Sequence, residues 1–226
     1  MIAETSGRAR AEDELLLGLR PGEAQGELRL VVTPHLCRTD GRFYGGAALA
    51  AALAAIEAAS GRAALWATAQ LVGSADRGEE LVVRTSVVAT GRSVSQVQVE
   101  GRVGERLVFG ALGAAATAID GGLAGTGPSM PAVPPPDDCA VLWGPDRAPT
   151  SLPGSDPAIG QHHACEHRRA PLLDPDEAGS GRRAMWSRLA GPWTIPGDPL
   201  TPAGLGFVAD MVPLALTAAC GVEGAG

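Results

Sequence analysis

The chain has 226 residues, 45% of them apolar and 19% charged, which is an ordinary globular composition with room for a sizeable core. Its formal net charge is −7. The chain contains no lysine, and its arginines are scattered along the sequence. An acidic chain without a basic cluster argues against a surface that follows nucleic-acid phosphates.

Cysteine spacing and hydropathy indicate the cellular compartment of the protein and whether it spans a membrane. The four cysteines are irregularly spaced and form no C-x-x-C motif, and nothing at the start of the chain resembles a signal peptide. The longest apolar stretch, residues 45–56, is well short of the roughly 20 residues that a membrane span needs. We therefore expect a reduced, cytoplasmic protein with no disulfide framework and no membrane span.

The first half of the chain contains a strand and then an unusual helix. Residues 1–26 are polar and punctuated by glycine, and we expect a short helix or an ordered arm there. Residues 27–33 are strand-like and end at Pro34. Residues 45–59 are apolar on every face, so this helix must be surrounded on most sides, and its many alanines would let a sheet approach closely.

Four further segments favour strands. They are rich in β-branched residues or alternate between apolar and polar, and glycine-containing turns separate them. The last one also suits a helix because of its three consecutive alanines. We expect a run of antiparallel strands around the buried helix, at residues 66–73, 80–90, 93–102 and 106–119.

The composition changes to Gly, Pro, Ser and Asp at residues 120–161, around three consecutive prolines. We interpret this stretch as a linker between an N-terminal unit, 1–119, and a second unit, 162–226. The second unit contains strand candidates at 163–170 and 183–190. Thr201 and Pro202 then start a helix that is predicted to run through Asp210 to about residue 219.

Four motifs in order carry a family resemblance. They are Arg42-Phe43-Tyr44-Gly45-Gly46, the segment 66–78, Gly91-Arg92-Ser93-Val94-Ser95, and Ala209-Asp210. Together they resemble the acyl-CoA thioesterase II-like family. The resemblance implies an α+β double hotdog, in which two units each wrap an antiparallel sheet around one helix. Because the chain ends at Gly226, we expect the second hotdog to be truncated.

The resemblance also implies roles for particular residues. The family's catalytic carboxylate lies in the helix of the second unit, where this chain has Asp210. Its threonine and glutamine partners belong to later strands and match no residue here. Many members also have a glutamine directly after the two glycines, where this chain has Ala47.

The residues themselves leave two interpretations of Asp210. A carboxylate among Phe207, Val208 and Met211 is costly to bury unless it is hydrogen-bonded or solvated, and burial would raise its pKa toward that of a general base. Alternatively, it is an aspartate bonded to nearby backbone. Pro213 favours this second interpretation, since it cannot donate to the carbonyl of Ala209.

Gly45 and Gly46 open a helix whose first N–H groups lack internal partners. Such a terminus can bind a thioester oxygen or stabilise an oxyanion, and the glycines are also compatible with a simple tight turn. We group Tyr44 with them as a substrate-binding candidate, although a lone tyrosine more often serves in packing.

Two other kinds of site are weakly indicated. His162, His163, Cys165, Glu166 and His167 form a cluster that fits no familiar zinc spacing, and adjacent members of an extended chain point to opposite sides. No G-x-S-x-G motif is present for a serine hydrolase. We therefore predict no metal and no cofactor.

The leading hypothesis is a hydrolase that cleaves acyl-CoA or a related thioester with water activated by Asp210. The alternative is a non-catalytic acyl-CoA-binding or assembly module with the same fold. A hotdog hydratase is less favoured, because His35 precedes a different segment from the one that such enzymes use. An incomplete second sheet would leave edges unpaired, so we also expect a homo-oligomer.

Overall fold

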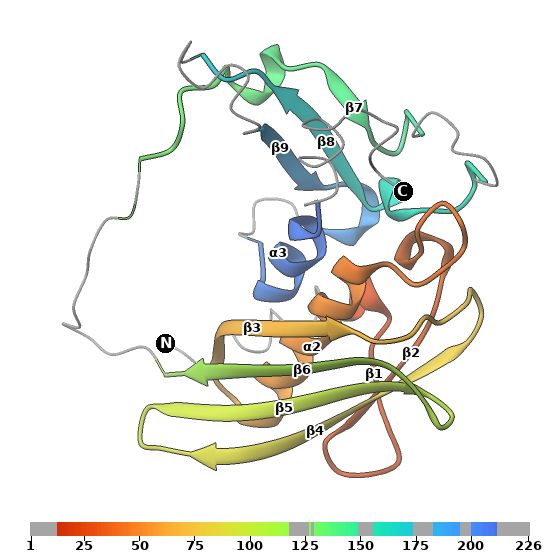
Figure 1. The fold of residues 1–226 in the computed structure, drawn as a ribbon, viewed down its shortest axis with the longest axis vertical. Coiled ribbons are helices and arrows are strands. Elements are labelled where there is room, and N and C mark those ends of the chain that lie inside the picture. The colour runs from red at the N-terminus through yellow and green to blue at the C-terminus, as the bar shows by residue number, and fades with distance from the viewer. Residues whose placement is uncertain are drawn as a thin grey trace.

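The computed structural model describes residues 13–117, 127, 129–148, 156–173, 183–194 and 200–211. Its described elements form two antiparallel sheets, and the helices α2 and α3 lie between them (Figure 1). In chain order, the larger sheet and α2 come first, and the smaller sheet and α3 follow. The predicted sequence of a strand, a buried helix and a run of antiparallel strands is confirmed.

The larger sheet has six strands in the order β1-β2-β4-β5-β6-β3. Residues 13–17 are helical and lead into it. All its pairs are antiparallel, and the longest ladder joins β5 to β6. The strands are β1 (Arg20–Pro21), β2 (Glu27–Val31), β3 (Ala63–Leu71), β4 (Glu80–Thr90), β5 (Val94–Val103) and β6 (Arg106–Ala116).

Helix α2 (Gly45–Ser60) runs across this sheet. Alanine has the highest helix propensity, and the alanines here fill both the face toward the sheet and the face toward α3. The helix ends at Gly61, whose left-handed φ of 64° lets its N–H bond to the carbonyl of Glu57. Ten of its residues are buried, as the absence of a polar stripe predicted.

The smaller sheet has the order β7-β8-β9, formed by β7 (Val141–Trp143), β8 (Cys165–Ala170) and β9 (Ala184–Leu189). The strand β7 lies inside the stretch 120–161 that the sequence analysis interpreted as a linker. Its three residues are too few to show an alternating pattern among the surrounding prolines and glycines. The linker therefore contributes a strand to the second sheet, while the division of the chain into units stays a prediction.

Short 3₁₀ turns connect these elements. They are η1 (Pro34–Leu36), η2 (Pro136–Asp138), η3 (Gln161–His163) and η5 (Gly191–Trp193). The turns η1 and η3 are in contact, and the N–H of Gly160 donates to the carbonyl of Pro34 at 3.0 Å. The second half of the chain is thereby joined to the first beside the start of α2.

Helix α3 (Pro202–Ala209) begins as predicted but ends earlier. The hydroxyl of Thr201 accepts a hydrogen bond from the N–H of Gly204 at 3.0 Å, and Pro202 occupies the first turn. Asp210 is the first residue after the helix, so its predicted place inside the helix is wrong. The apolar pattern continues past Asp210 in the sequence and gives no sign of this end, and residues 212–219 lie outside the described part.

The two helices pack through small residues. A Cβ on Gly206 would lie 2.7 Å from Cδ1 of Leu53 and 3.5 Å from the backbone nitrogen of Ala50. Such a contact is possible only because Gly206 has no side chain and α2 is built from alanine. The helix backbones therefore approach each other more closely than larger side chains would allow.

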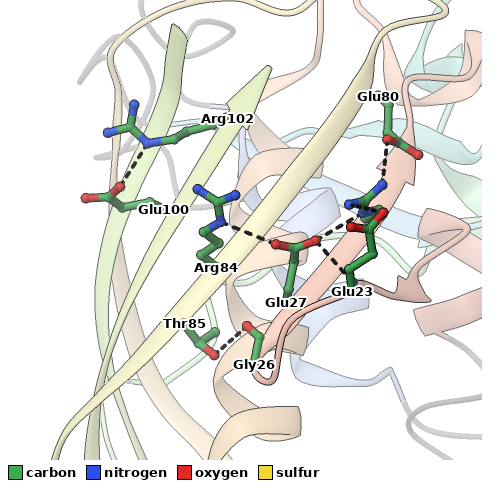
Figure 2. A network of polar contacts seen from close by, with 9 residues as sticks. Glu23, Gly26, Glu27, Glu80, Arg84, Thr85, Glu100 and Arg102 are labelled. Atoms are coloured by element: carbon green, nitrogen blue, oxygen red, sulfur yellow. Dashed lines mark hydrogen bonds and ion pairs between the residues drawn. The ribbon is translucent and has the colours of Figure 1, made fainter. Parts of the chain in front are cut away.

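A polar network lies on β2 and β4, with the buried Glu27 at its centre (Figure 2). Its carboxylate accepts hydrogen bonds from Nε of Arg29 at 3.1 Å and from Nε of Arg84 at 3.3 Å. The bond from Arg29 is the main reason that the pKa of Glu27 lies below its ordinary value. The network thus stabilises the fold above the unfolded-state pKa of glutamate, and this contribution is lost as the pH falls through the lowered pKa.

Among the described residues, no helix is both long enough and apolar enough to cross a membrane.

The packing of α2 predicts that replacing alanine by leucine changes the stability of the protein by different amounts at a buried and at a partly exposed position. Ala51 is fully buried, whereas Ala58 is partly exposed and lines a cavity of about 450 Å³. We expect Ala51→Leu to lower the free energy of unfolding by about 1–3 kcal/mol, and Ala58→Leu to change it by about 0.5 kcal/mol or less. Chemical denaturation of both variants measures this, and equal losses would show that α2 is not packed on all sides.

Candidate functional site

The carboxylate of Asp210 lies against the N-terminal end of α2. A Cβ placed on Gly45 would be 2.5 Å from Oδ2 of Asp210, so only a glycine leaves room for the carboxylate there. The backbone N–H of Gly46 lies near enough to the carboxylate to favour its charged form. The structure therefore brings Asp210, Gly45 and Gly46 together, although the two segments are far apart in the sequence.

Three opposing effects set the protonation of Asp210. Burial raises its pKa above the ordinary value of aspartate and is the largest effect. The N–H of Gly46 and the positive charge of Arg38 both favour the charged form and lower the pKa. Because burial outweighs them, the pKa is raised, which is the direction that a general base requires.

Tyr44 closes one side of the site. Its ring is 4% exposed and packs edge-to-face on Phe207, with the ring centroids 5.3 Å apart. Its hydroxyl donates to the backbone carbonyl of Asp210 at 3.0 Å. All the site residues that the sequence analysis named, at positions 44, 45, 46 and 210, thus lie in one place.

Arg38 is a further residue that acts on Asp210, and the sequence analysis did not name it. It lies in the turn between η1 and α2, where its N–H donates to the carbonyl of Arg42 at 2.7 Å and Gly41 adopts a φ of 81°. Its guanidinium donates to Asp40 at 2.7 Å and acts on Asp210 at longer range. An isolated arginine in a loop carries no motif, so no signal in the sequence marks it.

Leu71, at the end of β3, supplies an apolar wall. Its Cδ1 would lie 2.8 Å from a Cβ on Gly45, and its side chain is 58% exposed. An exposed leucine beside a carboxylate offers an apolar surface next to a polar group. The sequence pattern predicted that a strand ends near residue 71, but it did not predict that Leu71 lies beside Gly45.

The histidine and cysteine cluster is divided by the fold. Cys165 and His167 converge, with Sγ and Nε2 3.0 Å apart, and Nδ1 of His167 lies 2.8 Å from the hydroxyl of Ser187. His162 and His163 lie in η3 with their ring centroids 4.2 Å apart and the rings tilted by 37°, so the expected divergence of neighbours does not apply to them. Within the described ranges, no three His, Cys, Asp or Glu side chains are placed to hold a metal ion.

Two cavities lie away from this site. One, of about 250 Å³, is lined by residues that include His35 and Trp193, and the other is the cavity beside Ala58. Neither is lined by Asp210 or Gly45. Asp210 is the stronger candidate for a functional group despite this separation, since a carboxylate with a raised pKa beside the N–H groups of a helix start is a better indication than cavity volume.

The arrangement allows acid–base chemistry on a polar ligand. Asp210 is only half-buried, so water can reach its carboxylate. Gly45 is partly exposed, and its N–H belongs to the first turn of α2, where N–H groups have no partner within the helix. A water on the carboxylate and a ligand oxygen at the helix end could thus be held side by side.

Residues 33–119 match the model of the acyl-CoA thioesterase N-terminal domain. The structure of a proposed thioesterase from Novosphingobium aromaticivorans is 29% identical in sequence, and the match covers 90% of this chain and 75% of that chain with a TM-score of 0.73. No curated protein sequence matches the chain.

Two more distant structures show the fold. The acyl-CoA thioesterase II TesB2 from Mycobacterium marinum is 20% identical, with 93% of this chain and 73% of that chain covered and a TM-score of 0.68. A conserved protein with a hot dog fold from Alicyclobacillus acidocaldarius is 19% identical, with 88% and 68% covered and a TM-score of 0.63. The predicted α+β hotdog fold is confirmed, and the truncation of the second unit stays a prediction.

The contacts of Gly46 predict that a methyl group there is costly. A Cβ on Gly46 would overlap the backbone carbonyl of Phe207 and the ring of Tyr44. We expect Gly46→Ala to lower the free energy of unfolding by about 1–3 kcal/mol, although alanine is the better helix former. Gly110→Ala is the matched control, since a Cβ on Gly110 would meet nothing within 4 Å. Equal melting curves for the two variants would contradict this packing.

Proposed function

We propose that this chain, which belongs to an acyl-CoA thioesterase II-like family, hydrolyses acyl-CoA or a related thioester with Asp210 as the general base. The observation that carries the proposal is the half-buried carboxylate, with its raised pKa, at the glycine-opened end of α2. A raised pKa suits a carboxylate that takes a proton from water and later returns it.

In the proposed reaction, Asp210 acts first as a base and then as an acid. Asp210 takes a proton from a water molecule, and the resulting hydroxide attacks the thioester carbonyl carbon. The carbon–sulfur bond then breaks, and the proton passes from Asp210 to the departing thiolate, giving a carboxylic acid and the free thiol. The reaction consumes only water and the thioester, so it requires no cofactor.

The first turn of α2 supports the negative oxygen that forms in this reaction. The N–H of Gly46 acts on Asp210, so we assign the N–H of the partly exposed Gly45 as the donor to this oxygen. Leu71 would contact the first carbons of the acyl chain beside it. The resemblance implies a threonine and a glutamine as further partners, and we assign those roles to no residue.

A non-catalytic acyl-CoA-binding or assembly module is the second candidate. It is favoured by the position of Asp210 at the start of α2, because a carboxylate near the N–H groups of a helix N-terminus can serve as a cap. The buried Ala47, where many family members have glutamine, favours it as well. Turnover of thioester supports the enzyme, whereas retention of unchanged ligand supports the binding module.

We infer in addition that the chain self-associates through the edge strand β3. Within the described residues, β3 pairs only with β6, and its sequence from Ala63 to Leu71 contains no charge. Leu65 and Trp66 are 60% and 46% exposed on it. Edge strands that stay unpaired are usually protected by charge, so this edge suits pairing with a second copy.

A cytoplasmic location is also part of the proposal. Cys37, Cys139 and Cys165 are all free thiols and all buried. Free cysteines persist in a reducing compartment, which supports this location.

The role of Asp210 predicts both a mutant and a pH dependence. We expect Asp210→Asn to lower kcat/KM on acyl-CoA by about 100-fold or more, and the exposed Asp138→Asn to leave it unchanged. In the wild-type protein, kcat/KM should fall as the pH drops through the raised pKa of Asp210, since the base is then protonated. Full activity of a folded Asp210→Asn variant would remove Asp210 from catalysis.

The edge strand predicts a change in oligomeric state. Light scattering should show a dimer whose fraction grows with protein concentration, and Leu65→Lys should return it to the monomer because the charge would face the partner. Leu173 is equally exposed but lies outside β3, so Leu173→Lys is the control and should still dimerise. A wild-type monomer at all concentrations would refute self-association.

A further inference from the structure

The backbone of Asp210 forms a tight turn. Its φ of −79° and ψ of 61° are those of the central residue of an inverse γ-turn. The matching hydrogen bond is present, since the N–H of Met211 donates to the carbonyl of Ala209 at 2.8 Å. The direction of the carboxylate therefore depends on a three-residue turn and not on the regular geometry of α3.

The side chain of Tyr44 anchors this turn from outside. The hydroxyl of Tyr44 donates to the carbonyl oxygen of Asp210 at 3.0 Å and also lies 3.5 Å from Sδ of Met211. The carbonyl of Asp210 follows a helix end, where carbonyl groups have no partner within the helix. The hydroxyl satisfies this group and fixes the peptide on the C-terminal side of Asp210.

Tyr44 is itself held rigidly. Its N–H donates to the carbonyl of Leu36 at 2.9 Å, and its carbonyl accepts from the N–H of Ala48 at 3.1 Å. Its ring is buried against Phe207 of α3. A buried ring whose backbone is bonded on both sides places the hydroxyl in one position, which is what an anchor needs.

We propose that Tyr44 is a positioning residue, whose hydroxyl holds the turn at Asp210 so that the carboxylate meets the N–H of Gly46. This inference rests on the proposed function for its kinetic consequence. It gives Tyr44 a different role from the substrate contact that the sequence suggested, because the hydroxyl is already used within the protein. Tyr44 acts on the substrate only through Asp210.

The two residues are also coupled electrostatically. Burial raises the pKa of Tyr44 above its ordinary value, and the negative charge of Asp210 raises it further. The phenol thus stays protonated and remains a donor wherever Asp210 is charged. The same coupling means that a probe on Tyr44 senses the protonation of Asp210.

The first experiment compares the pKa of Asp210 in the wild type and in Tyr44→Phe by NMR of carbon-13-labelled aspartate. Loss of the hydroxyl should loosen the turn and weaken the bond from Gly46, so the pKa of Asp210 should rise by about half a pH unit or more. Thr85→Val is the matched control, since it removes another hydroxyl-to-carbonyl bond, at 2.9 Å to Gly26 (Figure 2), which involves none of the site residues. An unchanged pKa in Tyr44→Phe would overturn the inference.

The kinetic readout separates this inference from the proposed function. We expect Tyr44→Phe to lower kcat about tenfold or more while KM stays within about twofold, and to move the acidic limb of the rate profile to higher pH. A rise in KM alone would instead indicate a substrate contact and overturn the positioning role. If the wild type has no thioesterase activity, the proposed function fails, and the NMR comparison still decides the role of Tyr44.

If Tyr44→Phe does not fold, a fluorine label on the wild-type tyrosine, which keeps the hydroxyl, provides a second test. Tyr44 is the only tyrosine, so 3-fluorotyrosine places fluorine at this residue alone. Its fluorine-19 resonance should shift as Asp210 titrates, should lose that shift in Asp210→Asn, and should keep it in Asp138→Asn. A resonance that does not respond to Asp210 would overturn the inference.

Discussion

The start of α2 can contact the end of α3 only because glycines, which have no side chain, lie at this contact. Gly45 leaves room for the carboxylate of Asp210, and Gly46 leaves room for the carbonyl of Phe207. Farther along α2, the missing side chain of Gly206 brings α3 against Ala50 and Leu53 in the same way. Small residues on both helices are therefore a condition for the site as well as for the core.

This close approach explains the electrostatics of Asp210. A carboxylate at a helix N-terminus ordinarily has a lowered pKa, because the N–H groups and the helix dipole favour its charge. Here the same packing that brings the carboxylate to Gly46 also takes it out of water, and burial has the larger effect. The N–H of Gly46 and the charge of Arg38 oppose the effect of burial, because both favour the charged form of the carboxylate and lower its pKa.

The sequence predicted the elements well and the site in part. The helix was predicted at 45–59 and is found at Gly45–Ser60, because an alanine-rich segment between glycines has clear ends. The strand β7 was missed, since three residues show no periodicity. The end of α3 was also missed, because the apolar pattern that continues past Asp210 outweighed Pro213, a proline just beyond the helix end. Arg38 acts through space and carries no local pattern.

The neutral surroundings of Tyr44 complete the argument for its role. Cys165 of β8 lies close enough to act on Tyr44, and burial raises the pKa of this thiol to about 12. Burial likewise lowers the pKa of His167, which bonds to that thiol, to about 4. Near neutral pH both groups are uncharged, so this pair places no charge beside the phenol. Burial is the larger reason that the pKa of Tyr44 is raised, and the charge of Asp210 adds to it, so the hydroxyl that positions Asp210 is kept protonated in part by the group that it positions.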